Sequence, residues 1–160
     1  MAHKRRNLAV LGKIYKAYSR GNPDQLLSAM SEDVRFGLVA QQEHFRFGGV
    51  RKGKRWARRV ISEINEDYHW LKYEVREYIA QKDRVVALTG GRVKHRASGR
   101  VMTVDLVDVV RMKDGKIVEF TEHFDTAGLL AKQTGRKPGA RRRPREALSA
   151  RARRARTTRR

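Results

Sequence analysis

The 160-residue sequence predicts a single α+β domain in which helices pack on one face of an antiparallel sheet. Three observations support this prediction. Segments with helical periodicity are concentrated before residue 66, four strand-like segments follow one another, and the last two strands meet at an Asp114-Gly115 turn. Because Asp-Gly between two apolar runs is a strong hairpin signal, these two strands are expected to be antiparallel neighbours.

The first half of the chain is expected to supply three helices and one strand. Apolar residues recur at helical spacing between positions 7 and 19, and Gly21 followed by Pro23 ends that helix and begins the next. The third helix carries Trp56, Val60 and Ile64 along one side. The predicted elements are a helix at 7–19, a short helix at 24–30, a strand at 34–39, a loop at 40–50 and a helix at 54–65.

The second half is expected to form four antiparallel strands in succession, followed by a short helix. The strands are predicted at 70–80, 84–95, 101–112 and 117–124. Asp125 has the position of an N-cap for a last helix that extends through Lys132. Asp105 and Asp108 are three positions apart on one strand, so their side chains are expected on opposite faces of the sheet.

The positive charge of the chain is concentrated at its C-terminal end. The formal net charge is +21, and residues 136–160 contain twelve Lys or Arg, one acidic residue, no aromatic residue and one large aliphatic residue. Such a segment buries too little apolar surface to offset its chain entropy. We therefore expect a folded domain at 1–133 and a disordered Arg-rich tail at 134–160 that binds nucleic acid, without sequence preference, or another polyanion. The tail residues expected to contact the polyanion are Arg141, Arg142, Arg143, Arg153 and Arg154.

A second basic segment lies at the start of the third predicted helix. Residues 51–59 read RKGKRWARR and contain six Lys or Arg and no acidic residue. The positive end of the helix dipole adds to this charge. Two interpretations stay open: the segment docks a polyanion or an acidic ligand, or it is a plain solubilising surface.

The composition argues against several classes of protein. The chain has no cysteine, and its five histidines are not at metal-ligand spacing, so neither a disulfide nor a metal site is expected. It has no glycine-rich phosphate loop and no apolar run of membrane-spanning length. We therefore expect a cytoplasmic protein that has no membrane partner and needs no cofactor.

Between residues 7 and 133 the chain resembles the superfamily of SnoaL-like and nuclear transport factor 2-like proteins, which includes polyketide cyclases and ketosteroid isomerase. The resemblance is carried by the order of elements and by two phrases, YSRGNPDQLLSAMSEDVRF and DVVRMKDGKIVEFTEHFDTAGLL. It implies a cone-shaped, strongly curved antiparallel sheet packed on three N-terminal helices and open at one end to a deep apolar pocket. It also implies a homodimer formed through the outer sheet face, on which Val107 and Val109 are expected.

Ketosteroid isomerase is the most informative comparison within this superfamily. The strand LVDVVRM resembles the isomerase strand that carries a protonated aspartic acid, and the match falls on Asp108. The same match implies that Glu122 also points inward, from the neighbouring strand. The isomerase's tyrosine and its aspartate base fall on Ile14 and Leu38, so steroid isomerisation by that mechanism is not expected.

The candidate site combines acid-base groups with an apolar wall. Asp108 is interpreted as a neutral hydrogen-bond donor, and Glu122 or His44 as the base. Structural alternatives stay open: Asp108 binds a backbone amide, Tyr18 or an arginine, Glu122 forms an ion pair with an arginine such as Arg92, and His44 is an exposed loop residue. The residues expected to bind a ligand are Tyr18, Trp56, Leu106, Val110 and Phe124.

Two functions are compatible with these observations. The first is a pocket that binds a small hydrophobic carbonyl-type molecule and isomerises, cyclises or hydrates it by acid-base chemistry without a cofactor. The second is a non-catalytic dimeric binding module whose basic tail binds nucleic acid or another polyanion. The fold class alone does not decide between them.

Overall fold

The computed structural model describes residues 2–135, with side chains from residue 5 onward. The predicted Arg-rich tail, including Arg141, Arg142, Arg143, Arg153 and Arg154, lies outside the described residues. The elements are α1 (Ala2–Tyr18), α2 (Asp24–Ala29), β1 (Met30–Leu38), β2 (Gly49–Lys52), α3 (Lys54–Asp67), β3 (Tyr68–Gln81), β4 (Arg84–His95), β5 (Val101–Lys113), β6 (Lys116–Phe124) and α4 (Thr126–Thr134).

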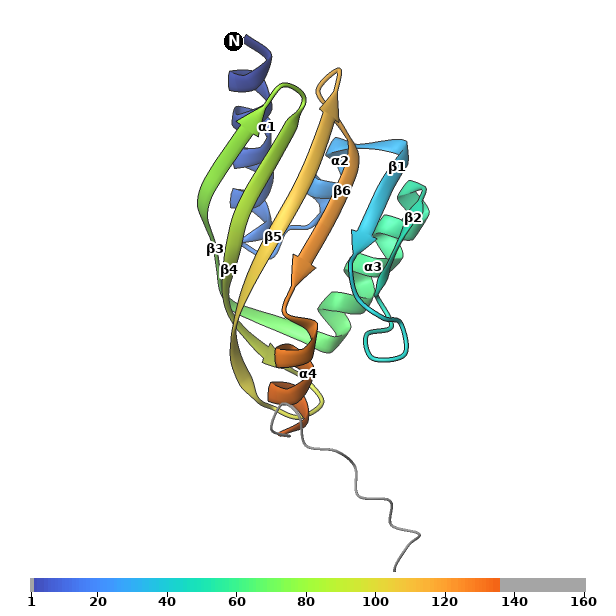
Figure 1. The fold of residues 1–160 in the computed structure, drawn as a ribbon, viewed down its shortest axis with the longest axis vertical. Coiled ribbons are helices and arrows are strands. Elements are labelled where there is room, and N and C mark those ends of the chain that lie inside the picture. The colour runs from blue at the N-terminus through green and yellow to red at the C-terminus, as the bar shows by residue number, and fades with distance from the viewer. Residues whose placement is uncertain (1, 136–160) are drawn as a thin grey trace, which may run out of the picture.

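A six-stranded curved sheet forms one layer, and α1, α2 and α3 cover one of its faces (Figure 1). The strand order is β2-β1-β6-β5-β4-β3, in which the last four strands form the predicted antiparallel meander. These features confirm the predicted α+β fold. The sheet departs from a purely antiparallel arrangement at one place, because β1 pairs in parallel with β6. The chain between these two strands crosses from one edge of the sheet to the other, so no hairpin joins them.

Strand β2 was predicted as part of a loop. It is only four residues long and is half-exposed or exposed throughout, so it has no apolar alternation to reveal it. Its pairing with β1 depends on glycine, because a Cβ on Gly37 would lie 2.0 Å from the carbonyl oxygen of Gly49. The absence of a side chain at this position lets the two backbones approach each other.

The concave face of the sheet and the three helices enclose the core. Inward positions of β5 are buried at every second residue, as the alternation predicted, and they include Leu106, Asp108, Val110 and Met112. Asp105 on the opposite face is exposed and forms an ion pair with Arg76. The two aspartates of this strand therefore face different environments, which the three-residue separation predicted.

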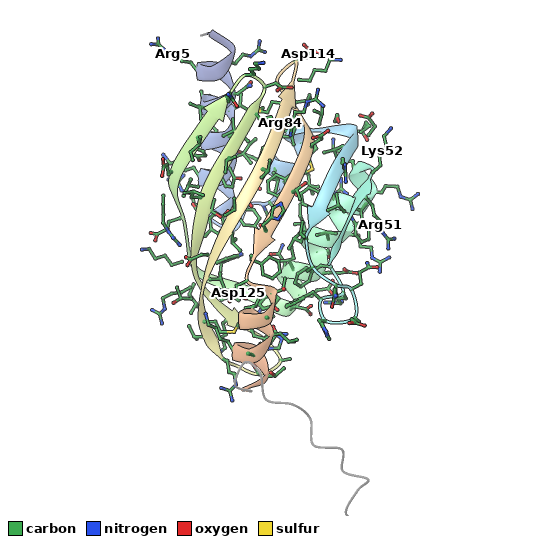
Figure 2. All side chains as sticks on the ribbon, viewed as in Figure 1. Arg5, Arg51, Lys52, Arg84, Asp114 and Asp125 are labelled. Carbon is green, nitrogen blue, oxygen red and sulfur yellow. The ribbon has the colours of Figure 1, made fainter. Side chains whose placement is uncertain are left out.

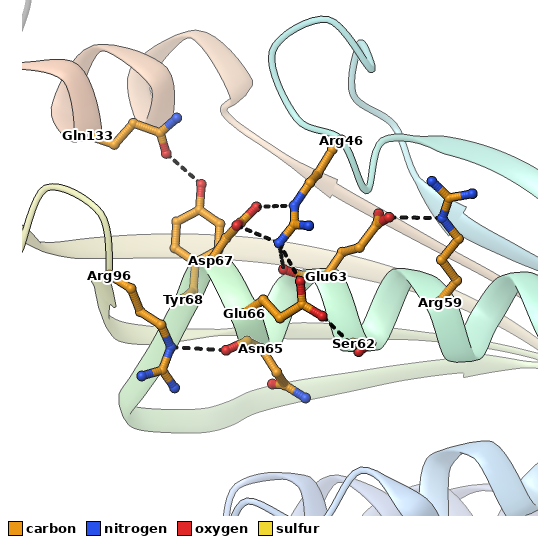
Figure 3. Close-up of polar contacts among 10 residues, drawn as sticks. All are labelled: Arg46, Arg59, Ser62, Glu63, Asn65, Glu66, Asp67, Tyr68, Arg96 and Gln133. Carbon is orange, nitrogen blue, oxygen red and sulfur yellow. Dashed lines mark hydrogen bonds and ion pairs between the residues drawn. The ribbon is translucent and has the colours of Figure 1, made fainter.

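Residues 39–48 form a loop between β1 and β2 that is tied to the end of α3 by Arg46 (Figure 3). The Arg46 guanidinium donates to Asp67 at 2.8 and 3.0 Å, and to Glu66 at 2.8 Å. A further contact joins α4 to the sheet, because the Tyr68 hydroxyl donates to the side chain of Gln133 (Figure 3). These contacts hold the loop and α4 at the same end of the molecule.

Candidate functional site

Two pockets lie between the sheet and the helices, and they share Leu38, Ile64 and Glu122. The first, here the end pocket, has a cavity volume of about 40 Å³, and α4 reaches it through Leu129. The second, the helix pocket, has a cavity volume of about 30 Å³, and α1 reaches it through Tyr15. Their walls are predominantly apolar and aromatic, as in most small-molecule sites. Glu122 is the one carboxylate that lines both pockets.

Glu122 is paired across the sheet with Asp108. The two residues are direct partners in the antiparallel register of β5 and β6, so their side chains project from neighbouring positions on the same face. Asp108 is completely buried, whereas Glu122 is partly exposed toward the pockets. The resemblance had implied that both carboxyls point inward, and the structure places them there side by side.

A hydroxyl from α1 completes the buried acidic cluster. Tyr15 donates a hydrogen bond of 2.7 Å to Oδ2 of Asp108. The other oxygen of Asp108, Oδ1, is buried, and no group of the described residues donates a hydrogen bond to it. A proton on Glu122 would satisfy this oxygen, since a protonated carboxyl donates one hydrogen bond.

Burial dominates the acid-base properties of the pair. Burial raises the pKa of Asp108 from 3.8 to about 7, and the hydrogen bonds with Tyr15 and Glu122 counteract this increase. Burial and the nearby charge of Asp108 raise the pKa of Glu122 well above its usual value. Two adjacent carboxyls in an apolar interior cannot both ionise near neutral pH, so the pair retains a proton there.

Aromatic side chains surround this pair and add further polar groups. Tyr73 packs edge-on against Tyr18 and Trp70, at ring-centroid distances of 5.2 and 4.9 Å. Burial raises the pKa of Tyr73 well above 10, so its hydroxyl stays neutral. The indole Nε1 of Trp70 is buried without a hydrogen-bond partner among the described residues. Trp70 also lines the end pocket with its ring, but its buried N–H is not exposed there.

The predicted ligand-binding residues divide into two groups. Tyr18 lines the helix pocket, and Leu106 and Phe124 line the end pocket. Val110 is fully buried in the core and lines neither pocket, because the neighbouring strands and helices cover it. Trp56 also lines neither pocket: it is partly buried against the core, its Nε1 donates to the carbonyl oxygen of Phe36, and two arginines lie over its ring.

The loop residue His44 is separate from the carboxyl pair. It lines a different hollow, between residues 39–50 and the start of α4, and its nearest acidic partner is Glu43 at 3.4 Å. The structure therefore does not bring His44 together with Asp108 or Glu122. Asp125 caps α4 by accepting a hydrogen bond from the backbone N–H of Gly128, as predicted for its structural role.

The alternative ion pair of Glu122 is also absent from the described part of the chain. Arg92 is exposed on the sheet, and no salt bridge within residues 5–135 involves Glu122. The same range contains no cluster of potential metal ligands. None of the described helices is long and apolar enough to span a membrane.

Tyr15 is the functional candidate that the sequence reasoning missed. It appeared as one of the apolar positions of the first helix, and the alignment with ketosteroid isomerase placed that enzyme's tyrosine one residue earlier, at Ile14. The structure shows that the side chain reaching the acid is Tyr15, and that Ile14 lines the helix pocket. The signal that could have identified it is its place on the buried face of the helix together with its hydroxyl, which needs a partner when buried.

Comparison with known proteins agrees with this architecture. An NTF2-like protein of unknown function from Burkholderia pseudomallei is 27% identical, with a TM-score of 0.74 over 81% of this chain and 98% of that chain. TerC, crystallised with polyporic acid, is 24% identical, with a TM-score of 0.71 over 81% of this chain and 98% of that chain. A protein from Jannaschia sp. CCS1, provisionally assigned as a SnoaL-like polyketide cyclase, is 14% identical, with a TM-score of 0.72 over 84% of this chain and 95% of that chain.

No match was found among curated proteins. The family model described as SnoaL-like domain matches residues 11–120, a range that contains Tyr15, Asp108 and the sheet up to the first half of β6, whereas Glu122 lies two residues beyond it. This chain therefore belongs to the SnoaL-like domain family.

Proposed function

We propose that this domain binds a small hydrophobic carbonyl-type molecule in its interior pockets and catalyses a proton-transfer reaction on it without a cofactor. The observation that carries the proposal is the Asp108–Glu122 pair, in which one buried carboxyl is adjacent to another that lines both pockets. Perturbed carboxyls of this kind are concentrated at functional sites. The crystallisation of TerC with polyporic acid lends support, since that protein shares this fold.

The proposed chemistry is a proton transfer by Glu122, the carboxyl that faces the ligand space. In its ionised form a carboxyl removes a proton from the carbon next to a carbonyl, and in its protonated form it returns the proton to the ligand. Asp108 lines neither pocket, so it acts through Glu122: held by Tyr15, it adjusts the proton affinity of its neighbour. Isomerisation moves a proton between two carbons in this way, and cyclisation can begin with the same deprotonation.

The pocket walls define which molecules can reach the pair. They include Phe47, Tyr68, Trp70 and Phe124 in the end pocket, so an unsaturated or aromatic ligand gains stacking and edge contacts. A ligand with one polar end and an otherwise apolar body fits this arrangement.

The test is to incubate the full chain with a mixture of hydrophobic metabolites and to identify retained molecules by native mass spectrometry. Glu122→Gln and Asp108→Asn are expected to reduce retention at least fivefold or to abolish its pH dependence. Asp105→Asn is the matched control, because this aspartate lies on the same strand but faces outward. Retention that is identical in all four proteins across pH 5 to 8 would remove the carboxyl pair from the proposal.

The second candidate function is a non-catalytic dimeric binding module. Its support is an apolar patch on the outer sheet face, where Ile79 is 53% and Val107 is 37% exposed. Val86 lies in register between Ile79 and Val109, and Leu88 is the partner of Val107. A charged substitution, Val107→Lys, is expected to convert a dimer to a monomer in sedimentation velocity. Val39→Lys, at an exposed loop position outside this patch, is the control, and a wild-type monomer at 100 μM would end this alternative.

A further inference from the structure

The edge of the sheet at β2 and the first half of α3 carry a dense group of positive side chains. This group, here the β2–α3 patch, occupies a nine-residue stretch without any acidic residue (Figure 2 labels its first two members at the margin of the molecule). Its members are Arg51, Lys52, Lys54, Arg55, Arg58 and Arg59. Neither the interior pockets nor the carboxyl pair uses any of them.

The ion pairs of the described residues leave much of this charge uncompensated. Lys54 binds Glu32 at 2.9 Å, Arg59 binds Glu63 at 2.9 Å, and the exposed Lys52 lies 3.7 Å from Asp33. Arg55 and Arg58 are exposed, and neither forms a salt bridge or side-chain hydrogen bond within residues 5–135. Their guanidinium groups are therefore available to an external anion.

Trp56 organises the neighbouring arginines. Its indole N–H donates to the carbonyl oxygen of Phe36 at 3.0 Å, which fixes the plane of the ring. The guanidinium carbon of Arg51 lies 4.5 Å from the ring centroid and that of Arg59 lies 5.9 Å from it. Arg51 is held further by Gln42, a neutral partner, at 3.0 Å. Cation–π contacts of this kind reduce the mobility of the arginines without neutralising their charge.

A groove on the sheet surface continues the patch. It contains about 940 Å³ of space including its opening to solvent, and it shares Arg51 and Lys52 with the patch. Lys52 pairs with Arg35 across β2 and β1, and Arg35 is in turn the partner of Glu119 on β6. The charged residues that line the groove are Asp33, Arg35, Arg51, Lys52, Arg111, Lys113 and Glu119.

We infer that the β2–α3 patch and the adjoining groove bind the phosphate backbone of a nucleic acid without sequence specificity. Cations extend around the sheet edge from α3 into the groove, which suits an extended polyanion better than a single compact anion. The side chains without an ion pair within residues 5–135, Arg55 and Arg58, are arginines. A planar guanidinium group can donate two parallel hydrogen bonds to two oxygens of one phosphate. The groove offers only Val50 and Val118 as apolar residues, so it lacks the large apolar side chains that insert into a lipid surface.

This surface is separate from the interior pockets, because none of its residues lines them. The test is fluorescence anisotropy of a labelled single-stranded RNA 20-mer of mixed sequence, titrated with the full chain between 50 and 200 mM NaCl. The double variant Arg55→Gln/Arg58→Gln is expected to weaken binding at least fivefold at 150 mM. The slope of log affinity against log salt is expected to fall by about 1 for each lost phosphate contact.

The matched control is Lys13→Gln/Lys16→Gln, which removes the same charge from exposed positions of α1. It is expected to change affinity less than twofold. Trp56→Leu alters no charge and is expected to weaken RNA binding at least threefold, because the two arginines lose their platform; circular dichroism checks that this variant is folded.

Three results would overturn the inference. Equal losses in the patch and control double variants would mean that binding follows total charge alone. Unchanged affinity in the Arg55→Gln/Arg58→Gln variant would place the binding elsewhere. Displacement of the RNA by polyglutamate at equal charge concentration, or tighter binding to phosphatidylserine vesicles, would assign the surface to an acidic protein or to a membrane.

Discussion

At the scale of single residues, the most deeply buried polar side chains of the described residues lie on neighbouring strands of the sheet, next to a tyrosine of α1. Asp108 and Thr89 are at most 1% exposed, and Tyr15 is 5% exposed. A buried carboxyl destabilises a fold unless it is neutral or hydrogen-bonded, and an aliphatic residue at the position of Asp108 would fit the alternation of β5 better. Such local departures from folding rules are expected where a site has a function.

Tyr15→Phe tests how far the helix supports this acid. The substitution removes the hydrogen bond to Oδ2 and leaves a buried carboxyl oxygen unsatisfied, so we expect a loss of about 1–3 kcal/mol in the free energy of unfolding. That hydrogen bond lowers the pKa of Asp108, so its removal raises this pKa further. The loss is therefore expected to be larger at pH 8, where the carboxylate is ionised, than at pH 5.

Urea unfolding at both pH values measures the effect. Tyr78→Phe is the control, since this ring lies 6.0 Å from that of Tyr15 but its hydroxyl has no hydrogen-bond partner within residues 5–135. A destabilisation by Tyr15→Phe that is no larger than that of the control would show that the Tyr15–Asp108 bond contributes nothing.

Asp108→Asn tests the linkage between the buried acid and pH. The pKa of Asp108 is raised from 3.8 to about 7, so between these values the folded state holds a proton that the unfolded state has lost. The stability of the wild type therefore falls as pH rises through this window, by about 1.4 kcal/mol per pH unit for one proton. Asparagine does not titrate, so the variant is expected to gain stability relative to the wild type from pH 4 to pH 7. A difference between the two proteins that stays constant over this range would contradict the prediction.

At the residue scale, the sequence predicted which side chains are buried where strand or helix periodicity is regular. The two-residue period of a strand predicted that Asp105 and Asp108 face opposite ways, and the resemblance to ketosteroid isomerase implied that Asp108 is the inward one. Periodicity could not identify Tyr15, because helical periodicity reports that a side chain is buried and not which distant group it meets. The spacing of Trp56 predicted a place on the core side of the helix, where the structure has it partly buried, but its cation–π contact with Arg51 depends on the local path of β2.

At the scale of elements, the regular segments were predictable and the irregular edge of the sheet was not. The meander from β3 to β6 followed from strand length, turn residues and the Asp114-Gly115 hairpin. The order of β1 beside β6 depends on contacts between residues about 85 positions apart, such as Phe36 with Phe120, whose rings stack at 5.1 Å. No local pattern encodes such a long-range pairing.

Arg46→Ala tests whether the ion pairs of Figure 3 hold the loop at residues 39–48. The substitution removes the contacts with Glu66 and Asp67, so we expect faster hydrogen exchange at the backbone amides of Phe45 and Gly48. The global melting temperature is expected to change little, because Arg46 is 46% exposed and solvent screens the pairs.

Arg96→Ala is the matched control for the loop prediction. Its guanidinium also binds the end of α3, through the carbonyl oxygen of Asn65 at 3.0 Å, but it has no contact with the loop (Figure 3). Exchange in the loop is expected to be the same as in the wild type. Equal acceleration by both variants would mean that the end of α3, and not the Arg46 contacts, controls the loop.

At the scale of the whole molecule, the excess of positive over negative side chains dominates the electrostatics. Residues 1–135 contain 26 Lys or Arg against 16 Asp or Glu, and the total net charge is +21. The composition predicts this excess, but it cannot predict where the charges meet on the surface. Arg35 lies beside Lys52 because β1 and β2 pair in this register. The fold therefore extends the positive surface from the β2–α3 patch into the groove.

This imbalance predicts that salt stabilises the protein. Repulsion among like charges exceeds the attraction of exposed ion pairs when one sign is in large excess, and added salt screens both. We therefore expect the melting temperature at pH 7.5 to increase as NaCl rises from 20 to 300 mM. The Arg55→Gln/Arg58→Gln variant is expected to melt at a higher temperature than the wild type at 20 mM and to show a smaller increase with salt, because two uncompensated charges of the patch are gone. A melting temperature that falls with NaCl would mean that the ion pairs outweigh the repulsion, and the patch would then be compensated by charges elsewhere in the chain.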